Sequence, residues 1–245
     1  MAVPDAAYHP LMRELTTALR RRCGVGEGAR LVVACSGGAD SVAAVRAVRL
    51  LAPRRRWRLE VRAVHVQHGL RGEAAEGDAA FVAALAGRFD VPFERRDVVL
   101  PDPERNVEAQ ARRARYAALA EAAEAAGASH VVTGQHADDQ LETLLLALVR
   151  GRGQNPRRLR GMAWDRPILP GSGVRLIRPM LGVTRVDVLD FLKTLDQDWR
   201  EDHTNADPTR PRNRLRRDVL PVLRELNPSV ARSTAALAER LRRRL

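Results

Sequence analysis

Aromatic residues, cysteines and long apolar runs are all scarce in this chain of 245 residues. Phe, Trp and Tyr make up 4% of it, so stacking platforms for single-stranded nucleic acid must be sparse. Cys23 and Cys35 form no CxxC pattern, which argues against a disulfide framework, a zinc site or an iron–sulfur site. Residues 1–22 contain no continuous apolar stretch typical of a signal peptide, and no segment is apolar enough to span a membrane. We therefore expect a cytoplasmic protein with no membrane partner.

Acidic residues are outnumbered by basic ones, 30 against 42, which gives a net charge of +12. Lys193 is the only lysine, and a coding bias toward Arg and Ala would explain that choice of cation. Such a bias does not explain why basic residues outnumber acidic ones. The charge therefore predicts a polyanionic partner, nucleic acid first, with a merely solvated basic surface as the alternative.

Strands and helices are predicted to alternate along most of the chain. Apolar runs and alternating patterns predict strands at 31–35, 59–66, 93–100, 129–134 and 175–180. Helical periodicity predicts helices at 7–22, 42–51, 75–89, 106–126, 137–150, 184–195, 214–226 and 230–244. The fold class expected is α/β, a doubly wound and mostly parallel sheet with a small helical C-terminal domain. We expect a nucleotide-binding domain at 1–182 and a helical domain at 183–245.

The segment Ser36-Gly37-Gly38-Ala39-Asp40-Ser41 lies between the first predicted strand and the helix that follows it. The two glycines remove side chains that would keep a ligand away from the backbone. The free N–H groups of the first helical turn then form an anion site best suited to phosphate. The segment lacks the Gly-Lys-Ser/Thr of a Walker A loop and the spacing of a GxGxxG loop. An ordinary glycine-rich corner is the alternative.

Three acids follow the fourth predicted strand, in the segment that runs from Gly134 through His136 to Thr143. On a helix, Asp138, Asp139 and Glu142 lie at relative angles of about 0°, 100° and 40°, so they share one face. Such a face can hold Mg²⁺ bound to ATP phosphates, or bind an ammonium group and accept its proton. Helix capping is the alternative, but it explains only the first two acids.

Histidine and arginine side chains offer further candidates. A zinc site at His65 and His68 is disfavoured, because residues three apart on a strand point to opposite faces and no Cys or His partner is nearby. Arg112 and Arg115 lie one turn apart and face either phosphate or solvent. The basic residues Arg212, Arg214, Arg216 and Arg217 surround Asn213 at a helix start, which favours contact with RNA phosphate.

These motifs together resemble a known family. The SGGxDS loop resembles that of the PP-loop ATP pyrophosphatases, and several further motifs are similar to those of the tRNA(Ile)-lysidine synthetases. These motifs are His68-Gly69-Leu70-Arg71, Ala111-Arg112-Arg113-Ala114-Arg115-Tyr116, the Gly134–Thr143 segment, Arg178-Pro179-Met180-Leu181, Glu201-Asp202-His203-Thr204-Asn205 and Arg212-Asn213-Arg214-Leu215-Arg216. Gln135 departs from the pattern, since the family usually has a second histidine there. Many relatives also carry larger C-terminal domains, so the resemblance is to a short form.

The resemblance implies an adenine nucleotide α-hydrolase-like fold and a two-step reaction on the wobble cytidine of tRNA(Ile). ATP would adenylate the C2 carbonyl oxygen, and the ε-amine of free L-lysine would then attack C2 and expel AMP. Catalytic roles would go to Asp40, Asp139 and Glu142, with Mg²⁺ on Asp40 and Asp139. ATP would contact Ser36, Gly37, Gly38, Ala39, Asp40, Ser41, His68, Arg71, Arg112, Gly134 and His136. RNA would contact Arg212, Asn213 and Arg216.

Two rival functions remain open on the residues alone. One is a different PP-loop enzyme, such as a tRNA thiolase or an amide-forming ligase. The absence of a CxxC pair weighs against thiolation, and a glutamine-dependent ligase would need an amidotransferase partner. The other is a non-catalytic RNA-binding protein with a vestigial ATP loop, against which the intact loop and the acidic face both argue.

Overall fold

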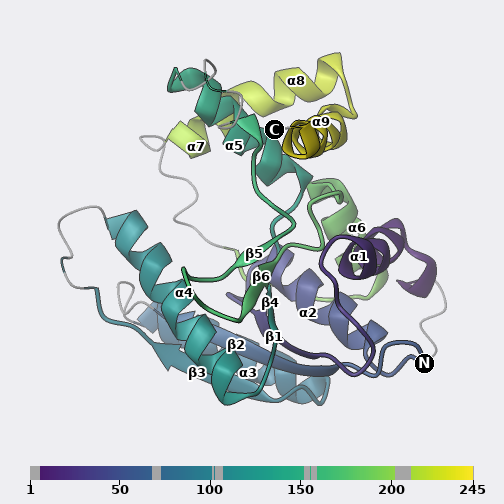
Figure 1. The fold of residues 1–245 in the computed structure, drawn as a ribbon, viewed down its shortest axis with the longest axis vertical. Coiled ribbons are helices and arrows are strands. Elements are labelled where there is room, and N and C mark those ends of the chain that lie inside the picture. The colour runs from purple at the N-terminus through teal and green to yellow at the C-terminus, as the bar shows by residue number, and fades with distance from the viewer. Residues whose placement is uncertain are drawn as a thin grey trace.

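The computed structural model describes residues 6–67, 73–100, 102, 107–151, 155, 159–201 and 211–244. Its centre is one sheet in which the described residues form six strands in the order β3-β2-β1-β4-β6-β5 (Figure 1). The strands are β1 (Arg30–Ala34), β2 (Glu60–Gln67), β3 (Phe93–Asp97), β4 (His130–Val132), β5 (Asp165–Pro167) and β6 (Arg175–Ile177). Every neighbouring pair is parallel except β5 with β6. The expected doubly wound, mostly parallel α/β fold is confirmed.

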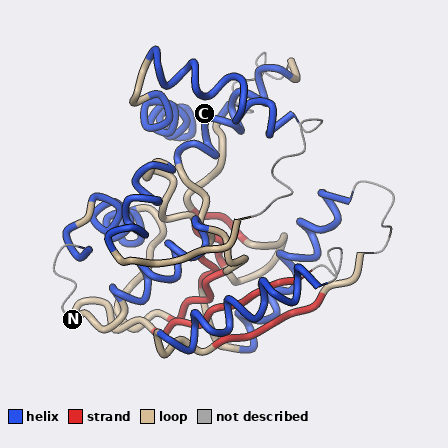
Figure 2. Tube along the Cα trace, turned by 180° about the vertical axis from the view of Figure 1, so that it is seen from behind, coloured by secondary structure: helices blue, strands red, loops and turns tan. Residues whose placement is uncertain are grey.

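Helices cover both faces of the sheet, because successive residues of each central strand point to opposite faces (Figure 2). Val32 of β1 and Val131 of β4 pack under α4 (Val107–Ala125). Val33 and Val132 pack on the other face, in the larger core. The helices of that core are α1 (Pro10–Arg21), α2 (Ala39–Leu51), α3 (Glu73–Arg88) and α6 (Arg185–Thr194).

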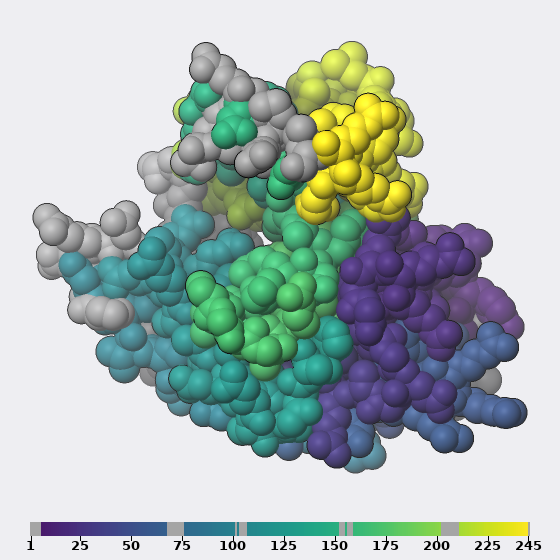
Figure 3. Space-filling model, in the orientation of Figure 1, coloured from purple at the N-terminus to yellow at the C-terminus, as the bar shows by residue number. Residues whose placement is uncertain are grey.

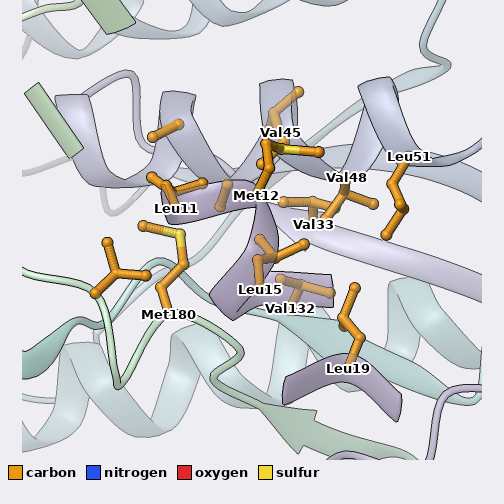
Figure 4. Packing of buried hydrophobic residues seen from close by; sticks show 14 of the residues in the cluster. Leu11, Met12, Leu15, Leu19, Val33, Val45, Val48, Leu51, Val132 and Met180 are labelled. Atoms are coloured by element: carbon orange, nitrogen blue, oxygen red, sulfur yellow. The ribbon is translucent and has the colours of Figure 1, made fainter. Parts of the chain in front are cut away.

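The larger core explains the apolar stripe of the N-terminal helix. Leu11, Met12, Leu15 and Leu19 of α1 are all buried, and they meet side chains of α2 and the central strands (Figure 4). Each fully buried Leu or Met side chain contributes about 1.5–3 kcal/mol of hydrophobic stabilisation. The helix thereby seals the face of the sheet opposite α4.

The edge strand β5 is not among the strands predicted from the sequence. It is three residues long and contains Pro167, so it carries no alternating pattern to detect. An edge position tolerates proline because one side of an edge strand needs no ladder donor. The expected strands at 93–100, 129–134 and 175–180 are also shorter in the structure, ending at Asp97, Val132 and Ile177.

The C-terminal region and helix α5 together form a group of helices above the sheet (Figure 1). Its members are α5 (Ala137–Val149), α7 (Pro211–Arg214), α8 (Leu220–Leu226) and α9 (Val230–Arg244). The single helix expected at 214–226 is interrupted by a π-helical turn, Leu215–Val219, in which the N–H of Leu220 bonds to the carbonyl of Leu215. Pro221 follows this turn and has no N–H for a regular helical bond, which accounts for the wider turn.

The helix α9 bridges two parts of the molecule. It packs along α5 and lies next to the N-terminal segment (Figure 3), where Arg22 forms an ion pair with Glu239. No helix among the described residues has the length and hydropathy of a membrane span.

Candidate active site

The loop between β1 and α2 closes on itself through the hydroxyl of Ser41. Ser41 Oγ accepts a hydrogen bond from the N–H of Ser36 at 3.0 Å and donates to the carbonyl of Gly38 at 2.9 Å. Gly37 has a φ of +90°, which favours glycine, and Gly38 is the N-cap residue of α2. The first N–H groups of a helix lack partners within it, so this end of α2 can bind an anion such as phosphate.

The end of β4 comes into close contact with this loop at Gly134. A Cβ atom on Gly134 would lie 2.5 Å from the carbonyl oxygen of Asp40 and 3.1 Å from the backbone nitrogen of Ser41. Both neighbours are backbone atoms, so a side chain there would displace the loop. Glycine at this position thus brings the two predicted binding segments together.

His136 lies between carboxylates from two helices and is 4% exposed. Its Nε2 atom is 3.4 Å from Asp40 Oδ1 and 3.6 Å from Asp139 Oδ2, and its Nδ1 atom is 3.6 Å from Asp138 Oδ2. Burial alone would lower the pKa of His136, but the three carboxylates outweigh it and raise the pKa to about 9. The imidazole is therefore a cation at neutral pH, beside the N-terminal end of α2.

Asp40 also carries a lowered pKa. Burial opposes its ionisation, but His136 and the guanidinium of Arg185, which forms an ion pair with it, together lower the pKa. Asp139 has a second task, because its Oδ2 atom accepts the N–H of His136 at 3.1 Å and so caps α5. The capping interpretation thus holds for Asp139 without removing it from the cluster.

Glu142 is the most enclosed of the three predicted acids, at 1% exposed. Its Oε2 atom accepts from Arg212 Nε at 2.7 Å, and its Oε1 atom accepts from Arg216 Nε at 2.5 Å. Arg216 also reaches Asp139 Oδ1 at 3.3 Å, so Asp139 and Glu142 share one guanidinium. Asp138 is directed elsewhere: it accepts from the N–H of Arg185 at 2.7 Å and from Arg224 Nη2 at 2.8 Å.

A cavity of about 540 Å³ joins these groups. Ten of the predicted site residues line it: Ser36, Gly38, Ala39, Asp40, Ser41, Arg112, Gly134, Asp139, Arg212 and Arg216. Gly37, His136 and Glu142 lie behind its wall, in contact with residues that line it. Asn213 lies beside Arg212 on α7. His68 and Arg71 lie outside the described residues.

Several lining residues were not predicted from the sequence. Arg185 reaches Asp40 from the start of α6, and Arg200 donates its backbone N–H to the carbonyl of Gly37 at 2.9 Å. Local sequence patterns do not predict these contacts, because Arg185 and Arg200 each contact a loop that is far away in the chain. Tyr116, with Val64 and Leu119, forms an apolar wall suited to a flat base.

The predicted magnesium ligands Asp40 and Asp139 both line the cavity, whereas His65, considered for zinc, is engaged in a hydrogen bond elsewhere. His65 Nδ1 lies 2.9 Å from the carbonyl oxygen of Cys35, which is a structural hydrogen bond. In the described parts of the chain, no group of three or more His, Cys, Asp and Glu side chains could hold a metal ion. Mg²⁺ needs fewer, since it uses one or two carboxylates together with substrate phosphates. Asp40 and Asp139 are the carboxylates predicted for this role, and in the structure Asp40 pairs with Arg185 and His136, while Asp139 pairs with Arg216 and His136.

Comparison with known proteins gives a consistent picture. The model of a PP-loop domain matches residues 8–223. A tRNA(Ile)-lysidine synthase from Symbiobacterium thermophilum is 38% identical over 95% of this chain and 48% of its own length. One from Geobacter sulfurreducens is 39% identical over 87% of this chain and 44% of its own length. The chain thus spans about half the length of these relatives.

A third relative is covered more fully. The tRNA(Ile)-lysidine synthase from a Synechococcus species is 37% identical over 96% of this chain and 69% of its own length. Among solved structures, the U34-tRNA thiolase of Methanococcus maripaludis superposes with a TM-score of 0.73 at 16% identity, covering 94% of this chain and 78% of that chain. This likeness concerns the fold alone. The chain belongs to the tRNA(Ile)-lysidine synthase family of PP-loop proteins.

Proposed function

We propose that this chain carries the catalytic part of an ATP-dependent ligase that joins L-lysine to C2 of the wobble cytidine of tRNA(Ile), forming lysidine. The observation that carries the proposal is one cavity with three kinds of site: a phosphate-binding helix end, a cluster of carboxylates, and arginines from a C-terminal segment. These match the three reactants, namely ATP, an amine and RNA.

ATP would bind with its phosphates at the start of α2 and its base against the apolar wall at Tyr116. The imidazolium of His136 adds positive charge behind the phosphate site, and Gly134 lets the end of β4 pack closely against the loop. Mg²⁺, held by Asp40 and Asp139, would neutralise phosphate charge. The cytosine C2 oxygen would attack the α-phosphate, forming an adenylated RNA and releasing pyrophosphate.

Lysine would enter as an ammonium ion, whose ordinary pKa of about 10.4 makes it a poor nucleophile at neutral pH. A carboxylate can bind the cation and then accept its proton, which frees the lone pair to attack C2. Glu142 is our choice for that role, because it lies one turn deeper than Asp139 and has the longer side chain. The C2–O bond would then break, with AMP as the leaving group.

RNA would meet the cationic rim of the cavity. Arg212 and Arg216 have side chains 35% and 39% exposed, and Asn213 lies between them in sequence. Phosphate contacts of this kind would position the anticodon loop over the cavity. A tRNA substrate would also place the protein in the cytoplasm.

Thiolation fits this chain less well, because both cysteines are buried thiols. Burial, with the nearby Asp165 charge, raises the pKa of Cys23 to about 12, and burial raises that of Cys35. A thiolate is the reactive form, so neither side chain is prepared for sulfur transfer.

The decisive test is incorporation of labelled lysine into a tRNA(Ile) transcript with ATP and Mg²⁺. Label in the RNA that depends on ATP, together with pyrophosphate release, is the expected result. A transcript with uridine at the wobble position is the control and should stay unlabelled. Absence of label from the cytidine transcript would contradict the proposal.

A further inference from the structure

The buried carboxylate of Glu142 is already occupied by cations of the same chain. Both of its oxygens accept hydrogen bonds from guanidinium groups, one from Arg212 and the other from Arg216. Arg216 adds a second contact to Glu142 at 3.1 Å through Nη2. The two arginines line the cavity and are partly exposed, whereas Glu142 is not. A substrate ammonium could not reach Glu142 while both guanidiniums remain there.

The same two arginines are the groups best placed to meet RNA phosphate. A guanidinium bound to a phosphate through its donors cannot use those donors for Glu142 as well. A buried carboxylate left without a cation is strongly disfavoured, so departure of the arginines is feasible only if another cation replaces them. Binding of RNA phosphate to the arginines and binding of a new cation to Glu142 therefore favour each other.

We propose that Arg212 and Arg216 are exchangeable counter-ions that couple RNA binding to amine binding. RNA phosphate draws the guanidiniums away from Glu142, and the terminal ammonium of the incoming amino acid takes their place. This inference rests on the proposed function, and it adds an order: RNA binding prepares the amine site, which stays closed by the arginines in its absence.

The local backbone suits such an exchange. Arg216 lies in the π-helical turn Leu215–Val219, and turns of this kind frequently occur at functional sites. The buried side chains of Leu215 and Leu220 anchor this turn, while Arg216 lines the cavity and Arg217 is exposed. The neighbouring acid Asp138 pairs with a different arginine, Arg224 on α8.

The first experiment uses the unaltered protein without ATP, so that no reaction consumes the ligands. Binding of labelled L-lysine is measured by equilibrium dialysis, alone and with a saturating 17-nucleotide anticodon stem–loop of tRNA(Ile). RNA should strengthen lysine binding about 5- to 150-fold, and lysine should strengthen RNA binding by the same factor. L-Norleucine, which lacks the terminal ammonium, should have no such effect. An RNA affinity that lysine leaves unchanged would overturn the proposal.

The second experiment compares Arg216→Gln with Arg217→Gln. Both remove one charge from the same turn, but Arg217 pairs with Asp218 and does not touch Glu142. Without RNA, R216Q should bind lysine more tightly than the unaltered protein and should respond less to RNA. R217Q can weaken RNA binding itself, but at saturating RNA it should still show the full strengthening of lysine binding, because both counter-ions of Glu142 remain in place. Should R216Q bind lysine no better and respond fully to RNA, the exchange does not occur. If R216Q does not fold, the reciprocity measured in the unaltered protein decides alone.

Failure of this proposal is distinct from failure of the proposed function. If the full reaction labels tRNA(Ile) with lysine but RNA and lysine bind independently, the exchange is wrong and the ligase activity stands. If lysine is neither incorporated nor bound, with or without RNA, the ligase assignment itself fails, and the exchange fails with it.

Discussion

The charge on His136 should make the stability of the protein depend on pH over a defined range. The folded protein holds this imidazole at a pKa of about 9, against an ordinary 6.5, because Asp139, Asp40 and Asp138 outweigh its burial. Since the folded pKa lies above the unfolded one, the stabilisation is complete below pH 6.5 and is lost as the pH rises to 9. The side chain is 4% exposed, so solvent screens it little, and the difference in pKa corresponds to about 3 kcal/mol.

The measurement is the free energy of unfolding by urea, followed by circular dichroism at pH 6.5, 7.5 and 9, for the unaltered protein and for His136→Gln. Glutamine keeps a polar group at this position but cannot titrate. Other groups titrate in both proteins, so the difference between the two free energies isolates His136. That difference should shrink by about 3 kcal/mol from the lowest to the highest pH. Parallel free energies across the whole range would refute the assignment of an imidazolium to this cluster.

Three further predictions concern the reaction. Asp40→Asn should abolish pyrophosphate release in a coupled assay with tRNA(Ile) and ATP, because it removes one of the two carboxylates available to Mg²⁺; turnover at the unaltered rate would exclude that role. Gly134→Ala should raise the KM for ATP at least tenfold, since its Cβ would press on the carbonyl of Asp40, while Gly26→Ala, with no atom within 4 Å, is the matched control and should leave KM unchanged. In single-turnover assays, Glu142→Gln should still form adenylated RNA but fail to transfer lysine, and equal loss of both signals would reject this division of roles.

The local parts of the fold and site could be predicted from sequence, because they depend on neighbours in the chain. The predicted strand, glycine pair and helix around Ser36–Ser41 form one contiguous segment. The structure shows the same strand–loop–helix, with β1 before the loop and α2 after it. The short edge strand β5 could not be predicted, since its three residues gain their conformation only by pairing with β6.

Sequence patterns could not predict which charged side chains form ion pairs with one another. Arg212 and Arg216 looked like free cations at a helix start, yet their partner Glu142 lies 70 and 74 residues away along the chain. Arg185 pairs with Asp40 across 145 residues. The fold decides which helices lie beside a guanidinium, and therefore whether it contacts solvent or a carboxylate. Amino-acid composition cannot predict that partner. Contact of Arg212, Asn213 and Arg216 with RNA stays a prediction.

The helix α5 belongs by sequence to the sheet-forming part of the chain and by packing to the C-terminal helices. Its Ala137 and Leu141 share one apolar cluster with Leu220, Ala231 and Ala235. Its first turn, meanwhile, holds the acids beside the phosphate loop. A protein engineer who wished to graft a different helical cap onto this sheet would have to replace α5 as well, and would thereby change the acids of the candidate site.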